Sequence, residues 1–183
     1  MSEIFPFQPT LTGETLLLRP VVSSDWDAIF AAASDPLIWE QHPVRDRYTD
    51  TSFRPYFATQ LAGGGTLIVI DRSSDAVIGW STYGNYLPEQ SRVEIGWTFL
   101  IRAQWGTAAN REMKHLMLAH AFEHVNTVAF RIGPDNLRSR RAIEKLGGML
   151  TDETDDIIIH GKPISHVVYT IEKEDFMNDA SNR

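Results

Sequence analysis

Two successive units of strand, turn and helix occupy the second half of the chain, and they constrain its fold more than any other feature. Residues 92–100 alternate with a period of two, which predicts a strand, and residues 108–124 change to a helical period. Residues 125–132 and 136–146 repeat this order of strand and helix, and Gly147-Gly148 ends the second helix. The chain is therefore predicted to build helices around one central sheet.

The remaining segments extend this pattern to β-α-α-β-β-β-α-β-α-β-β. The further strands are expected at residues 15–19, 66–71, 76–83, 157–159 and 164–171, and the further helices at 23–34 and 50–61. The last two strands form a hairpin through His160-Gly161-Lys162-Pro163. No repeat or linker divides the chain, so we expect residues 1–183 to form a single domain of the α/β (α+β) class, with about seven strands and four main helices.

Within the clearest strand and the helix after it, side-chain faces can be predicted. Val93, Ile95, Trp97 and Phe99 are expected on one face of the strand, with Glu94 on the other. Met113, Leu116, Met117 and Ala121 are expected to form the buried stripe of the helix.

Composition excludes several classes of protein. The chain has no cysteine, so it can hold no disulfide, thiolate zinc site or cysteine nucleophile. Its net charge of −7 argues against binding to nucleic acid or to an anionic membrane. We find neither an apolar run long enough to span a bilayer nor a secretory signal, and we expect a cytoplasmic protein.

Charge is unevenly distributed along the chain. Residues 102–145 contain eight basic and four acidic side chains, so this window carries +4 and the rest −11. Such a basic island suggests an anionic ligand, although a solvated helix face gives the same count.

The turn at residues 101–110 leads from the predicted strand into the predicted helix. A helix N-terminus has unpaired N–H groups and a partial positive charge, which together suit a phosphate. Gly106, Ala108 and Ala109 let such a ligand approach the backbone closely. The turn is neither a Walker A loop nor a dinucleotide fingerprint.

The second strand–helix junction carries a hydroxyl beside the buried stripe. Asp135 or Asn136 can cap this helix, and Ser139 shares a face with Ile143. A hydroxyl placed there has either a functional role or a hydrogen bond to a carbonyl one turn back.

Four segments, in this order, resemble the GNAT superfamily of acyl-CoA N-acyltransferases, and in particular its Rim-type branch of ribosomal protein N-terminal acetyltransferases. They are Leu16-Leu17-Leu18-Arg19-Pro20, Val93-Glu94-Ile95-Gly96-Trp97-Thr98, Trp105-Gly106-Thr107-Ala108-Ala109-Asn110, and Asn136-Leu137-Arg138-Ser139 through Lys145-Leu146-Gly147. The resemblance implies the GNAT fold, acetyl-CoA as co-substrate and transfer of its acetyl group to a primary amine by direct attack. The acceptor would be a protein or peptide α-amine or a small-molecule amine.

The resemblance also implies which residues form the site. The cofactor would be held by Phe99, Leu100, Trp105, Gly106, Thr107, Ala108, Ala109, Asn110, Asn136, Ser139 and Arg140. The chain departs from the family at Trp105, Ala108 and Asn110, and an alignment that starts at Ala103 also fits the loop. Ile143 stands where many members carry a tyrosine that acts as general acid.

Two residues are the candidates for catalysis. Glu94 could take the ammonium proton directly or through water, or it could be an exposed carboxylate on a half-solvated strand. Ser139, which the resemblance places near the sulfur, could hydrogen-bond the leaving thiolate while solvent supplies the proton.

Other polar and aromatic residues carry weaker predictions. His115, His120 and His124 match a metal-ligand spacing only loosely, so we expect no metal site. His160 and His166 lie in or near the last hairpin, where contacts with substrate are conceivable. A set of aromatic residues could line an acceptor groove or belong to the core: Trp39, Tyr48, Tyr56, Trp80 and Tyr83.

Two other functions compete with acetyl transfer. A GNAT-fold module that binds acyl-CoA without catalysis, as a sensor or partner-binding domain, is the main alternative. The absent tyrosine keeps it open, whereas the presence of Glu94 and Ser139 argues against it. An enzyme that binds a nucleotide phosphate is disfavoured, because the loop has no lysine and no acidic metal site accompanies it. The resemblance to the Rim-type branch also allows a homodimer of this protein.

Overall fold

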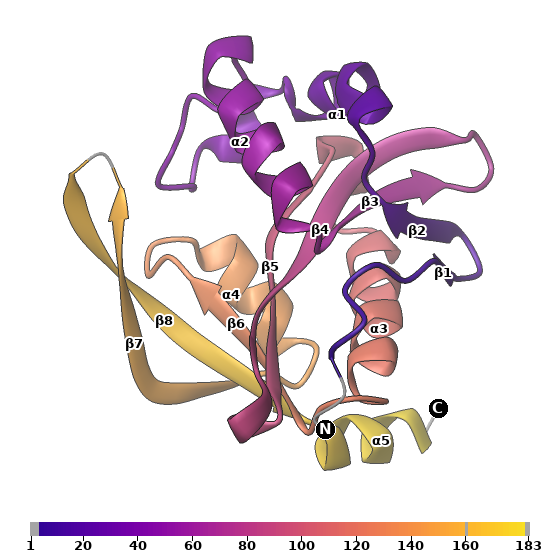
Figure 1. Ribbon diagram of the computed structural model, residues 1–183, viewed down its shortest axis with the longest axis vertical. Helices are drawn as coiled ribbons and strands as arrows, with labels where there is room; N and C mark the ends of the chain where they lie inside the picture. The colour runs from indigo at the N-terminus through magenta and orange to yellow at the C-terminus, as the bar shows by residue number, and fades with distance from the viewer. Residues whose placement is uncertain (1–3, 160, 182–183) are drawn as a thin grey trace.

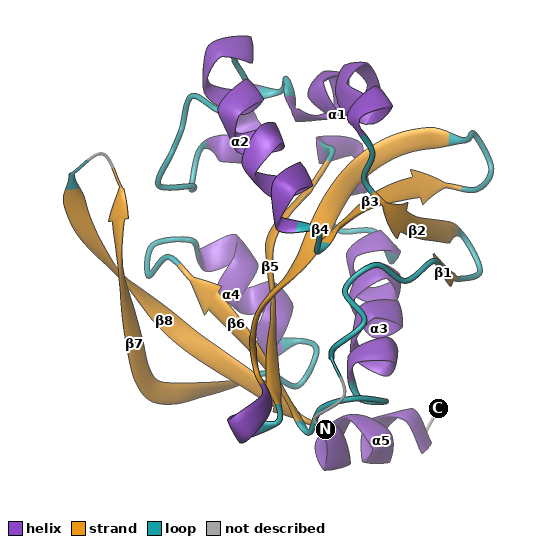
Figure 2. Cartoon of the chain, in the orientation of Figure 1, coloured by secondary structure: helices purple, strands orange, loops and turns teal. Residues whose placement is uncertain are grey.

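The computed structural model describes residues 4–159 and 161–181, which form one eight-stranded sheet with helices packed on it (Figures 1 and 2). The strands are β1 (Leu11–Thr12), β2 (Leu16–Pro20), β3 (Thr66–Asp71), β4 (Ala76–Leu87), β5 (Arg92–Leu100), β6 (Thr127–Ile132), β7 (Met149–Ile159) and β8 (Lys162–Glu172). The helices are α1 (Trp26–Ala33), α2 (Asp50–Gly63), α3 (Ala109–Ala121), α4 (Leu137–Glu144) and α5 (Lys173–Ser181). His160, which belongs to the predicted hairpin turn, lies outside the described residues.

The strands are ordered β1-β2-β3-β4-β5-β6-β8-β7 across the sheet. β5 and β6 are the parallel pair among the described strands, and their pairing covers only three positions, from Arg92↔Thr127 to Glu94↔Ala129. Beyond Glu94 the two strands diverge toward their carboxyl ends, as Figure 1 shows. We call this divergence of β5 and β6 the splay.

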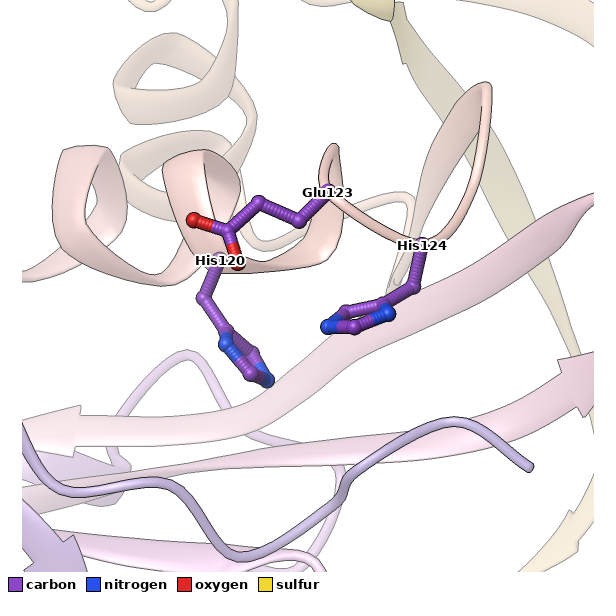
Figure 3. Close-up of side chains that lie close together, drawn as sticks. All are labelled: His120, Glu123 and His124. Atoms are coloured by element: carbon purple, nitrogen blue, oxygen red, sulfur yellow. The ribbon is translucent and has the colours of Figure 1, made fainter. Parts of the chain in front are cut away.

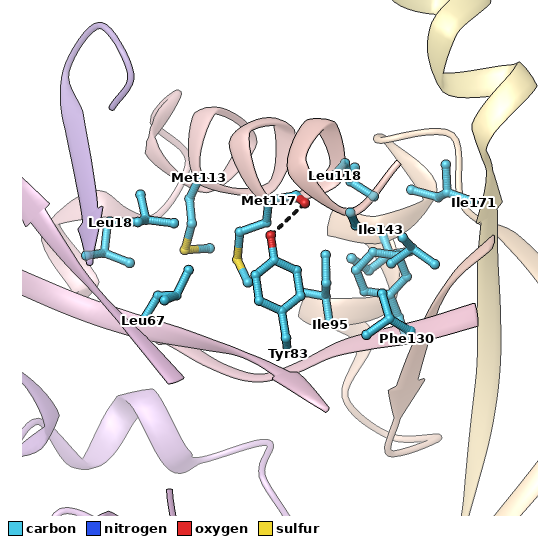
Figure 4. Close-up of a cluster of buried hydrophobic side chains, with 14 of the residues drawn as sticks. Leu18, Leu67, Tyr83, Ile95, Met113, Met117, Leu118, Phe130, Ile143 and Ile171 are labelled. Atoms are coloured by element: carbon cyan, nitrogen blue, oxygen red, sulfur yellow. Dashed lines mark hydrogen bonds between the residues drawn. The ribbon is translucent and has the colours of Figure 1, made fainter. Parts of the chain in front are cut away.

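Helices cover both faces of the sheet. On one face α3 and α4 pack on a core in which Met113 and Met117 meet Tyr83 and Ile95 of the sheet (Figure 4). On the other face α1 and α2 pack on a second, aromatic-rich core around Phe53, Trp80 and Phe99. Each Å² of apolar surface removed from water stabilises the fold by about 25 cal/mol, so burial in these two cores is the main favourable contribution to the free energy of folding.

Local sequence signals account for several helix ends. The Thr49 hydroxyl accepts a hydrogen bond from the Ser52 N–H at 3.3 Å and caps α2, and Gly64 ends that helix with a φ of +67°. Asn136 caps α4, because its Oδ1 accepts from the Ser139 N–H at 3.2 Å. The cap expected at Asp135 or Asn136 is thus formed by Asn136.

The predicted order of elements is confirmed, with two additions. β1 is only two residues long and is held by pairing with β2, so it has no readable period. α5 is largely polar and packs through Phe176, whose ring lies 5.2 Å from that of Phe122. The strands of the last hairpin are also longer than predicted.

The predicted side-chain faces of β5 are wrong beyond Ile95. Val93 and Ile95 face α3, but so do Thr98 and Leu100, whereas Phe99 packs on the α1/α2 side. An extra residue therefore interrupts the alternation, and it is Trp97, which has a φ of +50° and is 39% exposed. This β-bulge depends on pairing between strands, which a period of two in the sequence cannot reveal.

In the described part of the chain, no helix is both long and apolar enough to cross a membrane.

Candidate functional site

The splay is the place where the two strand–helix units open toward each other. β5 leads through the loop 101–108 into α3, and β6 leads through residues 133–136 into α4. Both helices therefore begin at the carboxyl ends of the parallel strands. Open α/β sheets bind their ligands in the crevice beyond such ends.

The loop before α3 presents unpaired backbone donors. No hydrogen bond is found among the described residues for the N–H groups of Gly106, Ala108 and Asn110. In contrast, the Ala109 N–H bonds the Thr107 hydroxyl at 3.2 Å, and the Thr107 N–H bonds Gln104 O at 3.4 Å. Gly106 has a φ of +75° with open space around it. The free donors at the start of α3 suit a phosphate or pyrophosphate group.

The loop contacts are compatible with both alignments of the loop. The N–H groups of Gln104 and Trp105 are used by a 3-10 turn, because they donate to Ile101 O and Arg102 O. A cradle that starts at Ala103 contains the bonded N–H groups of Gln104, Trp105 and Thr107. A cradle that starts at Trp105 contains those of Trp105, Thr107 and Ala109, so the two alignments hold equal numbers of bonded donors. Thr107 closes the turn through its hydroxyl, and Ala109 is buried in the core.

Trp105 connects the loop to its surroundings. Its indole N–H donates to Leu100 O at 3.1 Å, and the guanidinium of Arg138, from α4, lies 3.9 Å from its ring centroid. Arg138 also donates to Ile38 O at 2.9 Å, so one side chain joins α4 to both the loop and the segment after α1. In the sequence, Arg138 belongs to the basic island and to the last of the four segments that resemble the GNAT superfamily, but it is not among the predicted site residues. Its place in the first turn of α4 could have indicated this role.

The backbone of β5 turns toward the splay at alternate residues. The Ile101 N–H donates to Ile78 O of β4 at 2.8 Å, and Phe99 pairs with Trp80 of the same strand. Alternation then directs the polar groups of Leu100 to the splay and those of Phe99 to β4. Of the two strand residues predicted to face the cofactor, Leu100 is the one whose backbone polar groups are directed to the splay.

Glu94 is buried, which rules out the exposed carboxylate considered from the sequence. It is 3% exposed and lies on the α1/α2 face of the sheet, beside the last paired position of β5. Its Oε2 accepts from Asn85 Nδ2 at 2.6 Å and from Arg131 Nη1, whereas Oε1 lies next to Gly96. Burial raises the pKa of Glu94, and the bonds from Asn85 and Arg131 oppose this rise.

At the second strand–helix junction, between β6 and α4, the three predicted site residues have different surroundings. The Ser139 hydroxyl has no hydrogen bond among the described residues, so the expected bond to a carbonyl one turn back is absent there. Asn136 is used as the α4 cap through its Oδ1. Arg140 turns toward Tyr169, donating to its hydroxyl at 3.0 Å and to Pro134 O at 3.1 Å.

A buried lysine lies beneath the splay, and sequence reasoning missed it. Lys114 of α3 is 3% exposed and donates to Ser81 Oγ at 3.0 Å and Thr98 Oγ1 at 2.7 Å. Burial lowers its pKa to about 7. Lys114 lies three and four residues before Met117 and Leu118, and this spacing was the available signal. The predicted stripe included the half-buried Leu116 instead.

On the α1/α2 side of the sheet, the loop of residues 40–49 and an aromatic cluster lie close to the bulge of β5. The Tyr56 hydroxyl lies 3.5 Å from Trp97 O, and the Arg47 guanidinium lies 3.6 Å from the Tyr56 ring centroid. His42 accepts from the Val44 N–H at 2.9 Å, and burial lowers its pKa to about 3. Trp39, Trp80 and Tyr83 are core residues, whereas Tyr48 is exposed.

Two further features lie at the two ends of α3. A shallow hollow of about 510 Å³ borders the outer side of α3; it is lined by Gly13, Glu14, Ala108, Arg111, Glu112, His115 and Leu116. At the other end of α3, ligand atoms of His120, Glu123 and His124 lie within 4.8 Å of one another (Figure 3). They could approach a metal ion, but His120 Nε2 already contacts Pro6 O at 2.9 Å. His166 is buried on β8, and its Nδ1 lies 3.2 Å from Ile164 O.

Comparison with known proteins points to one family. Residues 15–149 match the family model of the acetyltransferase (GNAT) domain. A Bacillus subtilis (strain 168) protein, the uncharacterized N-acetyltransferase YnaD, is 26% identical over 140 residues, which cover 75% of this chain and 81% of that protein.

Solved structures show the same fold. A GCN5-related N-acetyltransferase from Brucella melitensis superimposes with a TM-score of 0.81 at 19% identity, over 95% of this chain and 83% of that one. Mycobacterium smegmatis RimJ in complex with CoA-disulfide superimposes with a TM-score of 0.66 at 17% identity, over 91% and 89% of the two chains. The match to the GNAT model extends over most of the chain, and the protein therefore belongs to the GNAT acetyltransferase family.

Proposed function

We propose that this protein transfers the acetyl group of acetyl-CoA to a primary amine by direct attack, and that the acceptor is a protein or peptide α-amine, as in the Rim-type branch, or a small-molecule amine. The observation that carries the proposal is the cradle of free N–H groups at Gly106, Ala108 and Asn110, next to the splay. RimJ, which shares the fold, was solved with a CoA derivative. We expect residues 1–183 to act as one domain and to need no metal.

The cradle and the splay together would bind and orient the co-substrate. The N–H groups of the loop would hold the pyrophosphate, and the helix dipole of α3 would favour its negative charge. The splay would admit the pantetheine arm, and the N–H of Leu100 would face the thioester carbonyl. Acetyl-CoA supplies an acyl group on a thiolate leaving group.

Glu94 would act on the amine. The two hydrogen bonds that Glu94 forms with described residues both reach Oε2, so within this part of the chain Oε1 keeps its lone pairs for an ammonium proton or a bridging water. Its raised pKa brings it nearer to the pKa that a general base needs at neutral pH. Its burial favours relay through a water over direct contact with a large acceptor.

Ser139 would stabilise the leaving thiolate of CoA. It lies in the first turn of α4, on the opposite side of the sheet from Glu94, so the two residues would flank a substrate that passes through the splay. Its free hydroxyl could donate a hydrogen bond to the departing thiolate while solvent supplies the proton. Ile143, which stands where many relatives carry an acidic tyrosine, is 5% exposed and belongs to the core.

The test is release of the free CoA thiol from acetyl-CoA with a panel of peptides and small amines. We expect Glu94→Gln to lower kcat by about 10²–10⁴, the usual contribution of a general base. Glu153→Gln is the matched control, because Glu153 is also a carboxylate held by an arginine, Arg92, but is half exposed.

Two outcomes would contradict the proposal. Tight binding of CoA without turnover on any acceptor would indicate the non-catalytic acyl-CoA-binding module instead. Failure to bind CoA would exclude both functions.

A further inference from the structure

Lys114 is a buried amine that has no ionic partner among the described residues. Its Nζ lies between the hydroxyls of Ser81 and Thr98, and none of the ion pairs found among the described residues includes it. Burying a charge without a counter-ion costs several kcal/mol in an apolar environment. An apolar side chain of similar length would fill the same space at lower cost, so stability does not explain this lysine.

The bonds of Lys114 converge on the β5 bulge. The Ser81 and Thr98 hydroxyl oxygens are 2.7 Å apart, and Thr98 Oγ1 in turn donates to Gly96 O at 3.2 Å. Gly96 and Thr98 are the two residues that flank Trp97. The lysine therefore ties both sides of the bulge to β4 and α3 through one connected set of hydrogen bonds.

The bulge needs such support. Trp97 has a φ of +50°, a conformation that costs about 1 kcal/mol or more for a residue with a side chain. β6 does not pair with β5 beyond Glu94, so the sheet supports this segment from one side only. Lys114 supports this segment from the α3 face of the sheet through its hydrogen bonds. Its Nζ also lies 5.8 Å from the ring centroid of Phe130 in β6.

The bulge also decides which backbone groups face the splay. Its extra residue shifts the alternation by one, so that the N–H of Leu100 points to the splay and Phe99 pairs with β4. Without the extra residue, the N–H of Phe99 would point to the splay and that of Leu100 would point to β4. The direction of the donor nearest the thioester thus depends on the segment that Lys114 holds.

We propose that Lys114 is a positioning residue for acyl transfer, which acts by clamping the Gly96–Trp97–Thr98 bulge through Thr98 and Ser81. This inference rests on the proposed function, because it assigns a task to the same splay. Lys114 does not itself touch the amine or the sulfur in this role.

The test compares Lys114→Met, Thr98→Val and the double variant with the wild type. Lys114→Met keeps the length of the side chain and removes its donors, and Thr98→Val keeps the shape and removes the hydroxyl. We expect kcat to fall about tenfold or more in each single variant, with CoA affinity changed less than about threefold. The double variant should resemble the single variants, because both break the same connection. Lys173→Met, at a half-buried lysine at the start of α5 that lies outside the basic island and the splay, controls for loss of a lysine charge and should retain wild-type kcat.

A spectroscopic measurement separates this inference from the proposed function. The carbonyl stretch of acetyl-CoA labelled with ¹³C at the carbonyl should shift to lower wavenumber on binding to the wild type and return toward its free value in Lys114→Met. This readout needs no acceptor, so it tests Lys114 even if no amine is acetylated.

Three results would overturn the inference. The first is an unchanged carbonyl band and unchanged kcat in Lys114→Met. The second is parallel loss of CoA binding and thermal stability, which would show that Lys114 serves only the fold. The third is a wild type that binds acetyl-CoA without shifting its carbonyl band.

Discussion

At the scale of single residues, burial changes the acid–base character of side chains around the splay. It raises the pKa of Glu94 and lowers the pKa of Lys114 to about 7. Both directions follow from the cost of holding a charge away from water. The same side chains on an exposed surface would be ordinary ions, so their environment determines what each can contribute to chemistry.

His42 gives a prediction for acid stability. Its pKa is about 3 in the folded protein, lowered first by burial and then by the charge of Arg47, against about 6.5 when unfolded. The unfolded chain therefore binds more protons between these values, and stability falls as pH drops from 6.5 toward 3. His42→Asn, which can still accept from the Val44 N–H, should remove this dependence.

Chemical denaturation at pH 4 to 7 measures the effect. We expect the free energy of unfolding of the wild type to fall, relative to His42→Asn, by up to about 1 kcal/mol per pH unit, allowing for partial solvent screening of the ring. His115→Asn, at an exposed histidine of α3, is the matched control. A difference between wild type and His42→Asn that stays constant with pH would contradict the prediction.

At the scale of elements, the loop and α3 form one functional unit. The 3-10 turn at Arg102–Gln104 uses two N–H groups, and the turn closed by Thr107 leaves those of Gly106, Ala108 and Asn110 free. The helix dipole adds a partial positive charge at the same place. Because the donors belong to the backbone, side chains here matter mainly by their size and charge.

A carboxylate placed in this loop should repel the pyrophosphate. We expect Ala108→Asp to weaken CoA binding about tenfold or more, which corresponds to at least about 1.4 kcal/mol. Ala119→Asp adds the same charge at an exposed position near the other end of α3 and should leave the dissociation constant almost unchanged. Calorimetry measures both, with circular dichroism to show that each variant is folded. Equal affinities in the two variants would refute the assignment of the loop.

At the scale of the whole molecule, one sheet with helices on both faces holds the splay open. β1 to β5 form an antiparallel half with α1, α2 and α3, and β6 to β8 form a second half with α4 (Figure 1). The halves join through three paired positions of β5 and β6 and through the core beneath them. The joint is short, so packing against α3 and α4 must supply much of its stability.

Tyr83 is a test of that core. From β4, its buried hydroxyl donates to Met117 O of α3 at 2.7 Å, as Figure 4 shows. Tyr83→Phe should lower the free energy of unfolding by about 1 kcal/mol, the usual contribution of such a hydrogen bond, with no change in the denaturant slope. Tyr48→Phe, at an exposed tyrosine, should have no measurable effect. Equal stability of Tyr83→Phe and wild type would show that this bond contributes nothing.

The sequence by itself determined the order of elements, a helix cap at Asp135 or Asn136 and the strand–loop–helix unit that carries the cradle. These features depend on neighbours within a few residues: a period of two or 3.6, a capping side chain, a glycine at a turn. For the same reason the resemblance of short segments was enough to identify the family. α5 and β1 escaped prediction because their local patterns are weak.

Only the tertiary structure decided the bulge at Trp97, the burial of Glu94 and the position of Lys114. The bulge arises from the pairing of β5 with β4 on one side and its early separation from β6 on the other. The buried carboxylate of Glu94 accepts hydrogen bonds from Asn85 of β4 and Arg131 of β6. The Lys114 amine donates hydrogen bonds to hydroxyls of β4 and β5. Each depends on partners distant in sequence, which a local pattern cannot encode.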